Sequence, residues 1–162
     1  ASAVDVSTAH NYYEQHLDAF VASGVSYVGF ATSAWAKDSP PGTGYAATPN
    51  AFSVNKTGTM WLSQANVGST GLTFTTGDYV LMFLAAGGGV YIGKNSGGTV
   101  TWASGHNPNT VGDTPNYTLP AGTWRPACGG DASGSNQVTM TTNFGASAWS
   151  TTPPTGAIGW TD

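Results

Sequence analysis

The chain is divided into short apolar runs by glycine-rich breaks. The run at residues 79–84, Tyr-Val-Leu-Met-Phe-Leu, follows Gly77 and precedes three consecutive glycines at residues 87–89. Six apolar residues are too few for a core helix but enough for a strand that is buried on both faces. Because similar runs recur at intervals of about ten residues, the sequence predicts an all-β fold, an antiparallel β-sandwich of short strands.

Composition supports this class of fold. Only 7% of the residues are charged, 23 residues are glycine, and Glu14 is the only glutamate, so strong helix formers are scarce. A chain of 162 residues is long enough to bury one hydrophobic core and too short for two complete domains. We therefore expect a single domain spanning residues 1–162, which could be the C-terminal module of a longer structural protein.

Other segments contain the β-branched and aromatic residues typical of strands. We expect residues 12–20 and 25–31 to form a first antiparallel pair. Residues 51–54 and 59–62 have the spacing of a hairpin, with Gly58 available for a positive φ. The remaining predicted segments are strands at 90–92, 99–102, 124–128 and 137–144, a turn at 94–98, and long loops at 33–49 and 103–118.

The charge pattern excludes several classes of partner. The formal net charge is −4, and the four basic residues, Lys37, Lys56, Lys94 and Arg125, are scattered. Nucleic-acid binding requires several clustered cations, so we expect no nucleic-acid partner. No run of about 18 apolar residues exists, so we expect no membrane insertion. The lone Cys128 excludes an internal disulfide, and we expect it to be a small buried residue in its strand.

Six segments in order resemble a SPRY domain, most closely the short SPRY domains of bacteriophage and bacterial surface proteins. They are Tyr-Tyr-Glu at 12–14, residues 26–32, Gly-Asp-Tyr-Val at 77–80, Gly-Lys-Asn-Ser-Gly at 93–97, Trp-Arg-Pro-Ala at 124–127, and residues 138–145 with the prolines at 153–154. The resemblance implies a concanavalin-like jelly-roll sandwich that recognises partners through loops at one edge rather than by catalysis.

The resemblance also implies which residues maintain the fold. These framework residues are Tyr13, Gly29, Asp78, Asn95, Trp124, Asn143 and Phe144. Little sequence precedes Tyr12, so the family's first strand is expected either to be shortened here or to belong to an upstream segment.

Catalytic patterns are missing from the sequence, and we predict that the chain is not an enzyme and uses no cofactor. A glycosidase needs two facing carboxylates, yet the aspartates are scattered and Glu14 has no evident partner. No serine lies in a Gly-x-Ser-x-Gly context. The glycines at 88 and 93 with Lys94 approach a phosphate-binding loop, but Asn95 stands where the motif needs Ser or Thr.

The long loops provide the candidate binding residues. Aromatic rings stack on sugars, and Asn, Asp and His side chains bond to their hydroxyls. The candidates are Trp35 and Tyr45 in the first loop and His106, Asn107, Asn109 and Asp113 in the second. Alternatively, the two aromatics pack their own loop onto the sandwich.

Two alternatives to ligand binding concern residues in and near these loops. The oxygens of residues 107, 109 and 113, or those of Asp131 and Asn136, could hold Ca²⁺, although such residues ordinarily stabilise turns. We expect Trp61, Trp102, Trp149 and Trp160, in or next to strands, to be core or interface residues rather than ligand contacts.

These observations give three hypotheses of function. The first is a non-enzymatic binding and display domain on a virion or cell surface, located on the virion surface or extracellularly. We expect a phage tail-fibre, spike or capsid-surface component that recognises a host glycan or protein through its loops. The second is a purely structural domain that contacts other virion proteins, or copies of itself in a parent fibre, through Trp149 and Trp160. The third, ranked last, is a jelly-roll enzyme that cleaves glycans.

Overall fold

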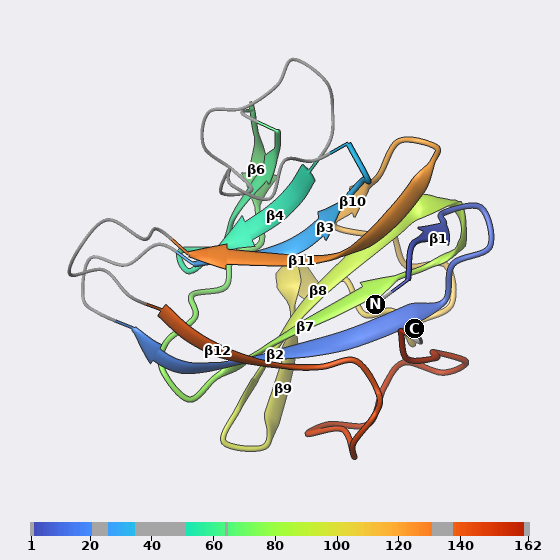
Figure 1. The fold of residues 1–162 in the computed structure, drawn as a ribbon. Coiled ribbons are helices and arrows are strands. Elements are labelled where there is room, and N and C mark those ends of the chain that lie inside the picture. Colours follow the sequence, from blue (N-terminus) through green and yellow to red (C-terminus); the bar gives the residue numbers. More distant parts are fainter. Residues whose placement is uncertain (1, 21–25, 35–50, 64, 131–137, 161–162) are drawn as a thin grey trace.

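The computed structural model describes residues 2–20, 26–34, 51–63, 65–130 and 138–160. Two six-stranded antiparallel sheets face each other as curved layers (Figure 1). The first sheet has the order β1 (Val4–Asp5), β11 (Thr123–Gly130), β3 (Ser26–Ala31), β4 (Ala51–Asn55), β5 (Thr59–Leu62) and β6 (Ala65–Ser69). The second has the order β10 (Tyr117–Thr118), β8 (Gly89–Ser96), β7 (Tyr79–Leu84), β2 (Asn11–Phe20) and β12 (Val138–Asn143), and β9 (Thr99–Trp102) pairs with β8. The predicted β-sandwich is confirmed.

The main core lies between the two sheets. Alternate residues of each strand point inward, so that Tyr13 of β2 and Met82 of β7 meet Phe30 of β3 in one buried cluster. The rings of Tyr13 and Phe30 pack edge to face with centroids 5.6 Å apart. The Tyr13 hydroxyl, deep in this core, donates a hydrogen bond of 2.5 Å to the carbonyl oxygen of Gly29. This bond ties the two sheets together.

The predicted pairing of the first two long strands is wrong. β2 pairs with β7 and β12, whereas β3 pairs with β4 and β11 in the opposite sheet. Sequence neighbours pair in only about two-thirds of cases. Here β2 and β3 each direct one apolar face into the shared core. Two strands can pack such faces against each other only when they belong to opposite sheets.

A second apolar cluster lies on the outer face of the second sheet. It consists of Tyr12 of β2, Leu81 and Phe83 of β7, and Tyr91 of β8. Part of its cover is residues 148–153, here called the strap, which belong to the C-terminal segment running outside this sheet (Figure 1). The ring of Trp149 in the strap packs edge to face on Tyr12, with centroids 4.9 Å apart. β7 is therefore buried on both faces, as its apolar run predicts.

Other predicted elements match the structure with small differences. The hairpin is β4 and β5, and Gly58 between them has φ of +79°. β8 continues to Ser96, so the turn before β9 is shorter than predicted. β6 was not predicted, and the predicted loop at 103–118 contains the 3-10 helix η2 (Ala103–Gly105) and ends in the two-residue strand β10. β1 is only two residues long. The other 3-10 helix is η1 (Ala86–Gly88).

Cys128 lies in β11 as predicted, but it is exposed rather than buried. The two-residue alternation of a strand places it on the same face as the buried Trp124. It lies four positions further along β11, two residues before the strand ends at Gly130. Among the described residues, no helix has the length and apolar character needed to cross a membrane.

Candidate functional site

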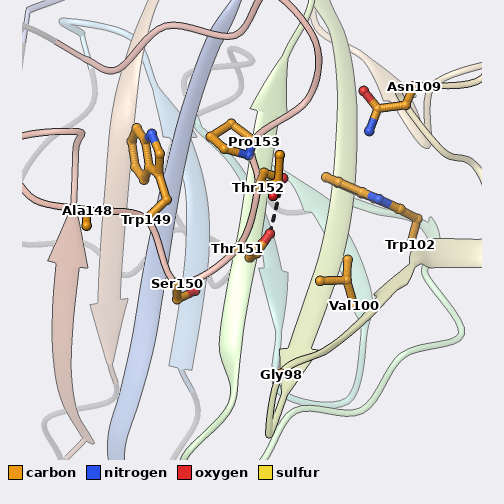
Figure 2. Close-up of a pocket in the computed structure, with 10 residues that line it drawn as sticks. All are labelled: Gly98, Val100, Trp102, Asn109, Ala148, Trp149, Ser150, Thr151, Thr152 and Pro153. Carbon is orange, nitrogen blue, oxygen red and sulfur yellow. Dashed lines mark hydrogen bonds between the residues drawn. The ribbon is translucent and has the colours of Figure 1, made fainter.

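A groove of about 830 Å³ opens on the outer side of the second sheet, between β9 and the strap. Figure 2 shows Val100 and Trp102 on one side, with Thr151, Thr152 and Pro153 of the strap facing them. The lining residues are Gly98, Val100, Trp102, Asn109, Ala148, Trp149, Ser150, Thr151, Thr152 and Pro153. None of the ten carries a charge, so the groove combines apolar and aromatic surface with neutral hydrogen-bonding groups.

One wall of the groove is built by the alternation of β9. Residues two apart in a strand share a face, and Val100 and Trp102 both line the groove. Trp102 pairs in register with Gly93 of β8. A Cβ at Gly93 would lie 2.8 Å from Cε3 of Trp102, closer than packing permits. The missing side chain thus allows the indole to lie against the sheet with one face covered.

The strap forms the other wall, and Glu14 of β2 holds it in place. The backbone N–H of Ser150 donates to Oε2 of Glu14 (2.8 Å), and that of Thr151 donates to Oε1 (3.2 Å). The hydroxyl of Tyr12 also donates to Oε1 (2.9 Å). Burial is the largest cause that raises the pKa of Tyr12, and the adjacent carboxylate of Glu14 is the second. The hydroxyl of Tyr12 therefore stays protonated and remains a donor.

Two asparagines connect the walls. Nδ2 of Asn95, under the groove, donates to the carbonyl oxygen of Ser150 in the strap (3.3 Å), while its Oδ1 accepts from the N–H of Gly98 (2.9 Å). Oδ1 of Asn109 accepts from the N–H of Thr155, just beyond the strap (2.8 Å). The two walls are therefore joined through hydrogen bonds that exist without a ligand.

Of the six candidate binding residues, Asn109 lines this groove. Trp35 and Tyr45 lie outside the described residues. Nδ1 of His106 lies 3.4 Å from Oδ1 of Asp113, within the same loop.

Asp113 and Asn107 organise that loop. Oδ2 of Asp113 accepts from the N–H of Asn107 (2.7 Å), and its Oδ1 accepts from the N–H of Thr114 (2.8 Å). These bonds lower the pKa of Asp113, and the bond from the N–H of Asn107 has the largest effect. Oδ1 of Asn107 accepts from the N–H of Asn109 (2.9 Å). Their oxygens thus serve turns, and within the described ranges no three His, Cys, Asp or Glu residues gather in a way that could hold a metal ion. Asp131 and Asn136 lie outside those ranges.

A smaller hollow of about 280 Å³ lies on the other side of the strap and contains Glu14, His16, Asp18 and Tyr79 among its lining residues. Nδ1 of His16 lies 2.5 Å from Oδ1 of Asp18. A glycosidase needs one carboxyl group as the acid and a second that is free to act as base or nucleophile. Both Glu14 oxygens accept backbone N–H bonds of the strap, and the carboxylate of Asp18 contacts His16 and accepts from the hydroxyl of Thr141. Both carboxylates of this hollow are therefore engaged by protein groups.

Sequence reasoning assigned Trp61, Trp102, Trp149 and Trp160 to the core or an interface. This is correct for Trp160, which is 4% exposed in the main core, and Trp61 of β5 is half-buried. Trp102 and Trp149 instead are half-buried and line the groove. A signal for Trp102 is present in the sequence, because Val100 and Trp102 share one face of a short predicted strand that follows a glycine turn.

The framework residues implied by the SPRY resemblance have structural contacts. Gly29 packs so closely that a Cβ there would lie 1.9 Å from the carbonyl oxygen of Phe52. Nε1 of Trp124 donates to the carbonyl oxygen of Pro120 (3.1 Å). Nδ2 of Asn143 donates to the carbonyl oxygen of Ala148 at the start of the strap (3.0 Å).

Comparison with known proteins agrees with this architecture. No family model matches the sequence, and a search of curated proteins gives no match. Among solved structures, the SPRY domain of human HERC1 superposes with a TM-score of 0.60 at 14% identity, covering 88% of this chain and 77% of that chain. At this identity the likeness concerns the fold alone. The chain has a SPRY-like antiparallel β-sandwich fold.

Proposed function

We propose that this chain is a non-enzymatic recognition module that binds a host-surface glycan or protein in the groove between β9 and the strap. We further propose that it is displayed on a virion or in the extracellular space. The observation that carries the binding proposal is the groove itself, about 830 Å³ in volume, whose two walls are already joined by Asn95. A site organised before binding loses less entropy when its ligand arrives.

The lining of the groove supports binding rather than catalysis. General acid–base chemistry requires a group that exchanges protons near neutral pH, and none of the ten lining side chains is of this kind. The half-buried aromatic Trp102 and the hydroxyls of Thr151 and Thr152 supply contact area and hydrogen bonds instead. The SPRY-like fold agrees with this proposal, because the resemblance implies recognition rather than catalysis.

Assembly through Trp149 and Trp160 is less well supported. Trp160 is 4% exposed and belongs to the core between the sheets, so it offers no surface to a neighbouring subunit. Trp149 is half-buried against Tyr12. Sedimentation of the purified chain at increasing concentration tests this alternative, which predicts association that Trp149→Ala weakens.

A cell-binding experiment tests the proposed function. The fluorescently labelled chain is incubated with a panel of intact bacterial cells, and retention is compared among variants. Val100→Ala removes groove surface, whereas Val111→Ala is its matched control, because Val100 is 40% exposed in the groove and Val111 is fully exposed but does not line it. Trp102→Ala removes the largest side chain of the β9 wall.

We expect wild-type retention on at least one strain, loss with Trp102→Ala, reduction with Val100→Ala, and no change with Val111→Ala. A parallel Trp35→Ala variant tests the loop prediction. Retention that is insensitive to Trp102→Ala but lost with Trp35→Ala would reject the groove as the site. No retention on any strain would reject surface recognition of bacterial hosts.

A further inference from the structure

We infer that the ligand of the groove is an uncharged carbohydrate, with one sugar ring stacked on the open face of Trp102. This inference rests on the proposed function and narrows its ligand to one chemical class. It depends on the orientation of the indole, the hydrogen-bonding groups around it, and the absence of charge along the lining.

Trp102 has the placement of a stacking platform. Its six-membered ring lies over the backbone of Gly93, where a Cβ would be 2.8 Å from Cε3 and 3.0 Å from Cζ3. One face is therefore covered by β8, while the half-buried side chain still lines the groove. An aromatic side chain fixed in this way loses little conformational entropy when a ligand binds. Its flat apolar surface suits the apolar face of a sugar ring.

Neutral polar groups surround this platform. Thr151 and Thr152 of the strap lie opposite it (Figure 2). The hydroxyl of Thr151 donates to the carbonyl oxygen of Thr152 (3.3 Å), so its oxygen is left as an acceptor, whereas the hydroxyl of Thr152 can both donate and accept. Asn109 lies at one end of the groove, with Oδ1 bonded to the N–H of Thr155. This bond orients the amide, and Nδ2 of Asn109 has no hydrogen-bond partner among the described residues. Sugar hydroxyls need this mixture of donors and acceptors.

The charges near the groove disfavour an acidic glycan. The described residues that line the groove include no cation, and the adjacent hollow contains the carboxylates of Glu14 and Asp18. The nearby Lys94 is already engaged, since its Nζ lies 2.9 Å from Oδ2 of Asp78 and donates to the carbonyl oxygen of Thr73. A sialylated or phosphorylated sugar would therefore bring an anion to a site without a counter-charge.

A peptide fits this groove less well than a sugar. Extended peptides commonly bind by adding a strand to a sheet edge, where backbone groups form the ladder. This groove instead lies on a sheet face, between the side chains of Val100 and Trp102 and the strap. A peptide bound there would have its backbone polar groups paired only by scattered hydroxyls and one amide.

A glycan array that displays neutral, sialylated, sulfated and phosphorylated glycans tests the ligand class, followed by calorimetry with the strongest neutral oligosaccharide. We expect signals on neutral glycans, a loss of affinity of about tenfold or more with Trp102→Ala, and a smaller loss with Trp102→Phe, which keeps an aromatic face. Val111→Ala should leave the affinity unchanged, and circular dichroism confirms that each variant is folded.

Cell binding separates failure of this inference from failure of the proposed function. If retention on cells depends on Trp102, is not competed by the neutral oligosaccharides and disappears when the cells are treated with protease, the ligand is a protein. The carbohydrate inference is then overturned, while the proposed function stands. Array signals confined to acidic glycans also overturn it. If cell binding is the same for wild type and Trp102→Ala, the groove itself is rejected.

Discussion

Glu14 holds the strap against the second sheet. It is 1% exposed, and its two oxygens accept hydrogen bonds from two consecutive N–H groups of the strap and from Tyr12. A carboxylate has only acceptors, so it matches three donors in a way that an amide cannot. The groove wall thus depends on a residue in β2 that lies 136 positions before Ser150.

Glu14→Gln should release the strap. The glutamine NH₂ group would face an N–H donor, leaving a buried polar group unsatisfied at a cost of roughly 2 kcal/mol. We expect this loss in the free energy of unfolding, measured by urea denaturation, together with weaker binding to the wild type's ligand. Asp18→Asn in the same strand is the control, because its partly exposed contacts with His16 and Thr141 contribute little. Equal effects of the two substitutions would contradict the role given to Glu14.

Gly93 positions Trp102, and a double-mutant cycle measures this dependence. Gly93→Ala places a methyl group against the indole and should tilt it, lowering the affinity for the ligand. In the Trp102→Ala background the same substitution has no indole to displace and should change the affinity little. Residues in contact show such non-additivity, with coupling of about 0.5–3 kcal/mol. Additive losses in calorimetry would show that Gly93 acts on binding by another route.

At the scale of elements, the turn before β7 is fixed by Asp78. Burial opposes the charged form of Asp78, but hydrogen bonds from Ser96, Lys94 and Thr75 outweigh it and hold the pKa of this carboxyl below its usual value. The N–H of Thr75 donates to Oδ2 at 2.7 Å, and Nζ of Lys94 in β8 lies 2.9 Å from the same oxygen. Asp78 therefore joins the β7 turn to the neighbouring strand.

The stability of the chain should fall in acid because of Asp78. A carboxyl with a lowered pKa in the folded state contributes stability above the pKa of the unfolded chain, near 3.8, and this contribution is lost as the pH falls through the folded-state value. Asp78→Asn should lower the free energy of unfolding at pH 7 and flatten its decline below about pH 4. Urea denaturation from pH 7 to pH 3 measures both effects. An unchanged acid slope in the variant would contradict the assignment.

Elements with a local pattern were predictable from the sequence, and contacts between distant segments were not. The apolar run of β7 and the glycine of the β4–β5 hairpin determine their structures through neighbouring residues. The assignment of β2 and β3 to opposite sheets depends on which faces meet in the core. The strap has no periodicity, and its position follows from hydrogen bonds to Glu14 and Asn95. Of the candidate site, Asn109 was predicted from loop chemistry, but the role of Trp102 depends on its register with Gly93.

At the scale of the whole molecule, the sandwich has two apolar clusters with different consequences. The main core between the sheets fixes the fold, with Tyr13 and Trp124 fully buried. The smaller cluster on the outer face of the second sheet requires the strap as a cover, and the groove forms where the strap meets β9. The binding proposal therefore places the site on a sheet face rather than on the loops at the sandwich edge that the resemblance implies.

The six tryptophans allow the most direct test of the groove. The chain is labelled with 5-fluorotryptophan, its fluorine resonances are assigned with single Trp→Phe variants, and the strongest neutral oligosaccharide from the array is titrated in. We predict that the signals of Trp102 and Trp149 shift with one common affinity, while those of the core residues Trp124 and Trp160 stay unchanged. If the oligosaccharide binds and the Trp102 signal does not move, or if only Trp35 responds, the groove is not the binding site.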